Sequence, residues 1–123
     1  MVLALEECGF TRYGHTPSLF KNPPPDVEKQ GKYVVISGNK TLSPNNVGDI
    51  AAANRRDNID GSKVRVIIIS RAGAEGLDFR GIRQIHVMEP WYNMNRPEQI
   101  IGRGVRTCSH SSLPYNQWNV MIF

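Results

Sequence analysis

A glutamine and two arginines near the end of the chain are spaced four and three residues apart, which places them on one face of a helix. Gln99, Arg103 and Arg106 fall in a predicted helix over residues 95–106. At about 100° per residue they lie within an arc of roughly 60°. A planar guanidinium donates two parallel hydrogen bonds to phosphate oxygens. The spacing therefore favours a face that binds a phosphate-bearing ligand, although a solvated basic face would contain the same residues.

The same predicted helix contains two glycines, which are unfavourable inside a helix. Gly102 and Gly104 each cost about 1 kcal/mol relative to alanine. We therefore expect a backbone or a ligand to approach this helix closely. Asn95 can cap its first turn, and Glu98 three residues later completes a pair that resembles a capping box.

A second segment, residues 70–79, reads SRAGAEGLDF. Gly73 and Gly76 allow the backbone to approach a ligand closely, and free amides in such a turn can bind phosphate. The spacing differs from the dinucleotide fingerprint, and the phosphate-binding loop GxxxxGK[ST] occurs nowhere in the sequence. A tight turn from a strand into a helix is the structural alternative.

Both segments lie among apolar runs that predict strands and helices. Strands are expected at 33–36, 64–69, 84–88 and 118–123, and helices at 1–8, 43–55 and 95–106. The β-branched run over 64–69 has the pattern of a strand buried on both faces. Strands that alternate with helices predict an α/β fold with a mainly parallel sheet flanked by helices. Ligands bind such sheets beyond the carboxyl ends of the strands, where residues 70–79 and 89–95 lie.

Residues 11–30 contain four of the eight prolines of the chain. Proline interrupts helices and central strands, so we expect a surface loop within a single domain of residues 1–123. A proline-rich peptide that binds a partner is the alternative for this segment.

The charge balance changes along the chain. Residues 1–60 carry seven basic and seven acidic side chains, whereas residues 61–123 carry eight basic and four acidic ones. Seven of those eight basic residues are arginine. This excess in the second half indicates a phosphate-bearing partner.

Other classes of site have little support in the sequence. The apolar runs are only a few residues long, so no membrane span or membrane partner is expected. Cys8 and Cys108 are far apart, as is typical of reduced thiols in an intracellular protein. Cys108, His110 and His86 fit no common zinc spacing, so we expect no metal site.

Together these segments resemble the C-terminal lobe of superfamily 2 helicases. Residues 70–79 resemble motif V, and residues 99–106 match the QxxGRxxR form of motif VI. Residues 89–93, EPWYN, stand where Swi2/Snf2-like and large-DNA-virus helicases have an acidic, proline, aromatic and asparagine stretch. The likeness covers about residues 31–123. The continuation RTCSH at 106–110 is most similar to helicase-like ATPases of large DNA viruses, including poxvirus transcription factors.

The resemblance implies a RecA-like fold and a part in an ATP-driven motor that acts on DNA or RNA. Arg106 would be the arginine finger, and Arg103 would contact phosphate beside it. ATP-binding residues would be Gln99, Gly76, Asp78 and Gly102, with Asp78 accepting from a ribose hydroxyl. Nucleic-acid-binding residues would be Ser70, Arg71 and Gly73.

The sequence also departs from a complete helicase. It lacks the strand and motif IV that precede the first helix of such a lobe, so the fold is expected to be incomplete at its N-terminal end. It also lacks the N-terminal lobe, with its Walker lysine and the acidic residues that hold Mg²⁺. We therefore expect the chain to act with an N-terminal helicase lobe of the same protein and not to hydrolyse ATP alone. It would work in the nucleus or cytoplasm, or in a viral factory or virion if it is viral.

Two other functions fit parts of the sequence. A basic α/β module that binds nucleic acid without nucleotide would also explain the arginine excess. A small-molecule enzyme such as a methyltransferase would use the turn at 72–76 and Glu89 as a ribose ligand, but it would leave the paired arginines without a role.

Overall fold

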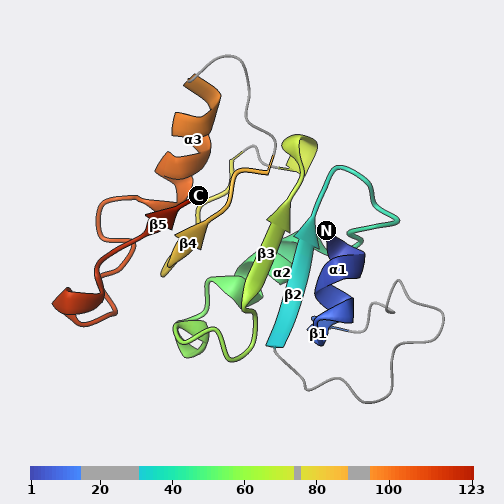
Figure 1. The fold of residues 1–123 in the computed structure, drawn as a ribbon, viewed down its shortest axis with the longest axis horizontal. Coiled ribbons are helices and arrows are strands. Elements are labelled where there is room, and N and C mark those ends of the chain that lie inside the picture. The colour runs from blue at the N-terminus through green and yellow to red at the C-terminus, as the bar shows by residue number, and fades with distance from the viewer. Residues whose placement is uncertain (15–30, 74–75, 89–94) are drawn as a thin grey trace. The chain divides into compact units, whose positions relative to one another are not determined.

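The structure is a computed structural model that describes residues 1–14, 31–73, 76–88 and 95–123. It contains two compact units, Met1–Ala74 and Glu75–Phe123 (Figure 1). Every strand pair in the described residues is parallel. Helices flank the sheet of the first unit, so the predicted α/β class is confirmed.

The first unit is built on a sheet in the order β1-β2-β3. Its strands are β1 (Phe10–Arg12), β2 (Gly31–Ile36) and β3 (Val66–Ile69). The prediction that the loop begins at residue 11 was wrong, because Thr11 and Arg12 belong to the short edge strand β1. Parallel pairing with β2 satisfies the backbone there before the prolines begin. The remainder of the expected loop, residues 15–30, lies outside the described residues.

The central strand β2 carries the core because both of its faces are covered. Alternate side chains of a strand point to opposite faces. Tyr33 donates a hydrogen bond to Glu6 in α1 (Val2–Glu7), and burial followed by this bond raises the pKa of Tyr33 well above its usual range. Val34 packs on the other face with Ala52 and Ala53 of α2 (Asn46–Ala53). A helix therefore packs on each face of this strand.

Both helices lie within their predicted ranges, but α2 begins three residues later and ends two residues earlier than the predicted 43–55. α1 ends before Gly9, whose φ of 91° is readily adopted only by glycine. Asn45 caps α2 by accepting a hydrogen bond from the amide of Gly48 at 3.3 Å.

The β-branched segment at 64–69 is less buried than predicted. Val64 lies in the core, but it precedes β3, whose residues are half-buried up to the exposed Ile69. The expectation of a strand covered on both faces was therefore wrong. Within the first unit, β3 is an edge strand, and continuous β-branched sequence does not distinguish an edge strand from a central one.

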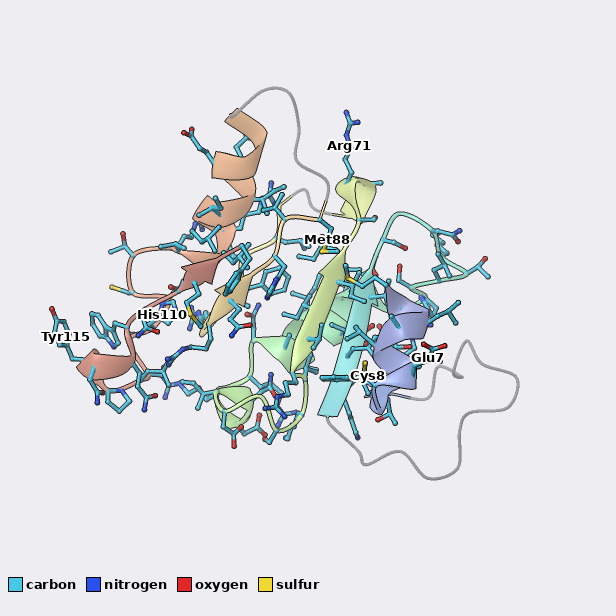
Figure 2. All side chains as sticks on the ribbon, in the orientation of Figure 1. Glu7, Cys8, Arg71, Met88, His110 and Tyr115 are labelled. Carbon is cyan, nitrogen blue, oxygen red and sulfur yellow. The ribbon has the colours of Figure 1, made fainter. Side chains whose placement is uncertain are left out.

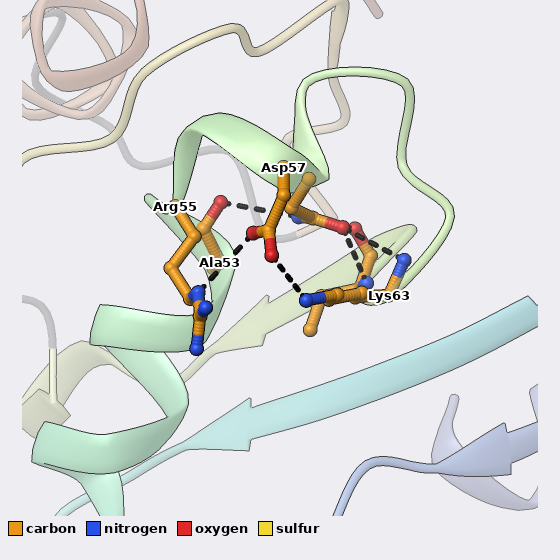
Figure 3. A network of polar contacts seen from close by, with 6 residues as sticks. Ala53, Arg55, Asp57 and Lys63 are labelled. Atoms are coloured by element: carbon orange, nitrogen blue, oxygen red, sulfur yellow. Dashed lines mark hydrogen bonds and ion pairs between the residues drawn. The ribbon is translucent and has the colours of Figure 1, made fainter.

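A buried asparagine joins the end of α2 to the start of β3. The amide nitrogen of Asn58, in the turn η1 (Arg56–Asn58), donates to the carbonyl oxygens of Ala53 and Val64 at 3.1 and 3.0 Å. Its oxygen accepts from the amides of Lys63 and Val64 at 2.9 and 2.7 Å (Figure 3). These bonds use the full hydrogen-bonding capacity of the side chain. Around it, exposed Asp57 pairs with Arg55 and Lys63.

The second unit contains a parallel pair of strands and the arginine-bearing helix. Its elements are β4 (Gln84–Ile85), α3 (Asn95–Gly104), the turn η3 (Tyr115–Gln117) and β5 (Met121–Ile122). Both strands are shorter than predicted. Trp118 ends η3 and donates its indole N–H to the carbonyl of Leu113 at 2.8 Å, so it does not join β5.

Asn58→Ala tests whether the asparagine holds this connection. Its loss leaves buried backbone groups without partners, so we expect the free energy of unfolding to fall by about 3 kcal/mol. Thermal unfolding followed by circular dichroism measures the change. Asp57→Asn is the matched control, because it removes only exposed ion pairs and should leave the midpoint near that of the unchanged protein. Equal effects of the two substitutions would contradict the assignment.

Candidate functional site

An open depression in the second unit brings together two segments that the sequence singled out. Its cavity volume is about 310 Å³, and its lining residues are Gly76, Leu77, Asp78, Gln99, Gly102, Arg103 and Arg106. This volume is at the small end of the range for small-molecule sites. The depression can therefore contact one side of a ligand but cannot enclose it.

The segment 76–79 is attached to helix α3 by its last residue. Phe79 is buried, and its amide donates to the carbonyl of Arg103 at 3.5 Å. Gly76 has a φ of 70°, and among the described residues, its chain neighbours aside, no atom lies within 4 Å of the position of a side chain there. A glycine that turns the chain at an open position leaves its backbone accessible to a ligand.

The two glycines of α3 have different surroundings. A Cβ atom on Gly104 would lie 2.9 Å from Cδ1 of Ile85 and 3.4 Å from Cγ2 of Ile82, so this glycine allows the helix to contact both isoleucines. Gly102 has open space around it and faces the depression. Close backbone approach therefore explains Gly104, while Gly102 leaves room for a ligand.

Arg106 reaches the depression from a turn and not from the helix face that the sequence predicted. α3 ends at Gly104, and the amide of Ser109 donates to the carbonyl of Arg106 at 3.0 Å in the turn that follows. Cys108, with a φ of 64°, helps to form this turn. Glycine in the last turn favours the helix end, so the predicted helix to residue 106 was two residues too long. The side chain of Asn95, the expected cap, lies outside the described residues.

Arg106 forms an ion pair across the depression. Its Nη1 atom lies 2.6 Å from Oδ2 of Asp78. Both side chains are more than half exposed, at 62% and 55%. Exposed pairs of this kind contribute at most about 1 kcal/mol to stability. The fold therefore depends little on this contact.

His110 anchors the turn that carries Arg106. Its Nε2 atom lies 2.8 Å from the carbonyl oxygen of Ile82, and its Nδ1 lies 2.8 Å from the hydroxyl of Ser109. Figure 2 shows its position in the second unit.

The other histidine considered for a metal site, His86, stacks on Phe123 with ring centroids 4.7 Å apart. In the described part of the chain, no group of three His, Cys, Asp or Glu side chains is arranged to hold a metal ion.

The first unit contains the other half of the glycine-rich segment. Ser70 follows β3, and its amide donates to the carbonyl of Ile36 at 2.9 Å. Arg71 begins the turn η2 (Arg71–Gly73) and is exposed, extending away from the ribbon in Figure 2. Both residues lie at the carboxyl end of the sheet, as the sequence predicted.

Gly73 packs closely against the end of β2. A Cβ atom there would lie 2.8 Å from the carbonyl oxygen of Ile36 and 2.9 Å from the Cα of Ser37. Packing against the end of β2 therefore accounts for this glycine, and its expected contact with nucleic acid stays a prediction. Gly38 has the same role, since its Cβ would lie 2.9 Å from that of Ala72. Gly38 was not among the predicted site residues, although it lies two residues after the predicted strand 33–36.

The segment 89–93 lies outside the described residues, as does the carboxylate of Glu89 that a methyltransferase would require.

Comparison with known proteins decides the family. Residues 27–108 match the helicase conserved C-terminal domain. The chain belongs to this family. The match includes every residue of the depression, and the expected likeness to superfamily 2 helicases is confirmed.

Relatives of this helicase C-terminal domain occur in large DNA viruses. A protein of Acanthamoeba polyphaga mimivirus named as an ATP-dependent RNA helicase is 41% identical over 73 residues, which are 59% of this chain and 13% of that protein. A termination factor NPH-I homolog of African swine fever virus is 38% identical over 66 residues, or 54% and 9%. Nucleoside triphosphatase I of Choristoneura biennis entomopoxvirus is 41% identical over 68 residues, or 55% and 10%. The match therefore spans a small part of each relative.

The paired substitutions Gly102→Val and Gly104→Val test how α3 is seated in this helicase domain. Valine at 104 overlaps Ile82 and Ile85, so we expect a loss of about 1–3 kcal/mol in the free energy of unfolding. Valine at 102 enters open space and should change it by no more than about 0.5 kcal/mol. Denaturant unfolding measures both. Equal losses at the two positions would show that the close contact at Gly104 is unimportant.

Proposed function

We propose that the chain is the second lobe of an ATP-dependent helicase or translocase, and that ATP binds between this lobe and an N-terminal lobe that holds Mg²⁺. The observation that carries the proposal is the depression in the second unit. Every residue that the family resemblance puts on the nucleotide side lines it: Gln99, Gly76, Asp78, Gly102, Arg103 and Arg106.

In this proposal Arg106 is the arginine finger. Phosphoryl transfer develops charge on the equatorial oxygens of the γ-phosphate, and a guanidinium from a second lobe stabilises it. The exposure of Arg106 and its position in a turn anchored by His110 support this role. Arg103 binds phosphate beside it. Delivery from a separate lobe makes hydrolysis depend on closure of the two lobes.

The remaining residues of the depression bind the rest of the nucleotide in this proposal. Gly76 and Gly102 leave room for a ligand, because in the described part of the chain no atom outside the adjoining backbone lies within 4 Å of a side-chain position at either residue. Gln99 provides an amide for hydrogen bonding, and Asp78 accepts from a ribose hydroxyl. All four groups come from segments joined by the contact between Phe79 and Arg103.

Nucleic acid binds the first unit in this proposal. Ser70 and Arg71 contact the phosphate backbone of DNA or RNA beyond the carboxyl end of β3, and Gly73 keeps their turn close to β2. No described helix has the length and apolar character needed to cross a bilayer. The partners in this proposal are nucleic acid and an N-terminal helicase lobe, as the family resemblance implies, and the proposed site of action is inside the cell.

Arg106→Ala tests the catalytic role in an ATPase that joins this domain to an N-terminal ATP-binding lobe. We expect kcat to fall by about 10³- to 10⁵-fold. ATP affinity should fall by no more than about fivefold and thermal stability should change little, because the guanidinium acts mainly on transition-state charge and its contacts in this open depression are exposed. Arg106→Lys should not restore turnover, since an ammonium group lacks the planar fork. Steady-state kinetics and calorimetric unfolding supply the measurements.

Arg83→Ala is the control for that experiment. Arg83 lies in the same unit, but its guanidinium donates to Asn119 at 3.0 Å. Its loss should leave kcat within about tenfold of the unchanged enzyme, a difference of about 1.4 kcal/mol in barrier. If Arg106→Ala has no larger effect than this control, or unfolds the protein, Arg106 is structural and the proposed role is wrong.

The nucleic-acid role predicts weak, salt-dependent binding by the chain itself. Phosphate contacts release counterions, so affinity should fall as salt rises, with a dissociation constant of about 10⁻⁴ to 10⁻⁶ M at physiological salt. Arg71→Ala should lower affinity and reduce the salt slope by about one. Arg56→Ala removes an exposed arginine before β3, at the opposite end of the strand, and should change neither. Fluorescence anisotropy with single-stranded oligonucleotides measures the slopes, and an unchanged slope for Arg71→Ala would contradict the role.

A further inference from the structure

The ion pair between Asp78 and Arg106 has a consequence for how a ligand enters the depression. Both residues line it, and Nη1 of Arg106 lies 2.6 Å from Oδ2 of Asp78. A phosphate oxygen that binds Nη1 from within the depression, along the direction of this ion pair, must take the place that the carboxylate oxygen occupies. Two anions cannot share one position beside the same cation without strong repulsion.

We propose that Asp78 is a resting partner for Arg106 and that a phosphate-bearing ligand binds by exchange, replacing the carboxylate on the guanidinium. This inference rests on the proposed function, because it concerns the same depression. The carboxylate keeps Arg106 in the depression when no ligand is bound. It thus acts as a positioning residue for the arginine and as a competitor for its anionic ligand.

The exchange favours a ligand with two kinds of group. When phosphate binds the guanidinium of Arg106, the carboxylate of Asp78 loses that charged hydrogen-bond donor. A sugar hydroxyl on the same ligand can donate to that carboxylate and restore a hydrogen bond, whereas fully ionised inorganic pyrophosphate has no hydroxyl to donate. The arrangement therefore selects a polyphosphate that carries a sugar hydroxyl over a simple polyphosphate anion.

The exposure of the pair makes this exchange easy. With side chains 62% and 55% exposed, both groups remain partly hydrated when they separate. Exposed pairs have measured strengths that correspond to no more than about a fivefold change in an equilibrium constant. The competition should therefore reduce anion affinity by about two- to fivefold, which allows ligand binding while keeping the arginine in place without ligand.

The test titrates inorganic pyrophosphate and ADP separately into the chain and into Asp78→Asn. Amide resonances of Gly76 and Gly102 report on binding, and the Nε–Hε resonance of Arg106 reports on the ion pair. We expect Asp78→Asn to bind pyrophosphate about two- to fivefold more tightly. Its affinity for ADP should be unchanged or lower, since asparagine is the poorer acceptor for a hydroxyl. Glu98→Gln, an exposed acid on α3, is the control for loss of one negative charge.

A double-mutant cycle with Arg106→Gln separates exchange from general electrostatics. The gain in pyrophosphate affinity should disappear when Arg106 is absent, and its persistence would overturn the exchange. An Arg106 resonance that is identical in the unchanged chain and in Asp78→Asn would also overturn it, even if ADP binds. If Asp78→Asn alters that resonance but ADP shifts neither glycine amide, the resting pair is supported and the proposed nucleotide site is wrong.

Discussion

Helix α3 can lie against Ile82 and Ile85 because residue 104 has no side chain. A Cβ atom there would lie 2.9 Å from Cδ1 of Ile85, so any larger residue would move the helix or the isoleucines. The helix brings Gln99, Gly102 and Arg103 to one side of the depression. This position of the helix also allows the carbonyl of Arg103 to accept a hydrogen bond from the amide of Phe79. That bond holds the neighbouring Asp78 at the depression. The geometry of the depression therefore depends on this contact.

The charges in the depression follow from that geometry. Arg106 lies in the turn after the helix, and His110 holds the turn through the carbonyl of Ile82. Ile82 thus contacts both the helix and the turn, and couples the position of Arg106 to that of α3. The depression combines a cation, a carboxylate and open glycine backbone, which are complementary to the phosphate and hydroxyl groups of a nucleotide.

In the first unit, glycines allow two turns to pack closely together. Gly73 and Gly38 allow the turns after β3 and β2 to pack against each other, which keeps Ser70 and Arg71 at the carboxyl end of the sheet. At the amino end of β3, Asn58 satisfies four backbone groups with one side chain. The end that carries the proposed nucleic-acid contacts is therefore shaped by close backbone packing, and the other end is held by a buried amide.

The sequence by itself determined the parallel α/β class, the existence of α2 and the two segments that carry the candidate site residues, because periodicity and residue chemistry are local properties; their grouping around one nucleotide came from the resemblance to helicase motifs. Tertiary structure decided that Gly73 and Gly104 serve packing while Gly76 and Gly102 stay open, since a glycine pattern cannot show which atoms approach it. It also ended α3 before Arg106 and paired that arginine with Asp78, which is 28 residues away in the sequence. Contacts between distant segments depend on how elements pack, and no local pattern encodes them.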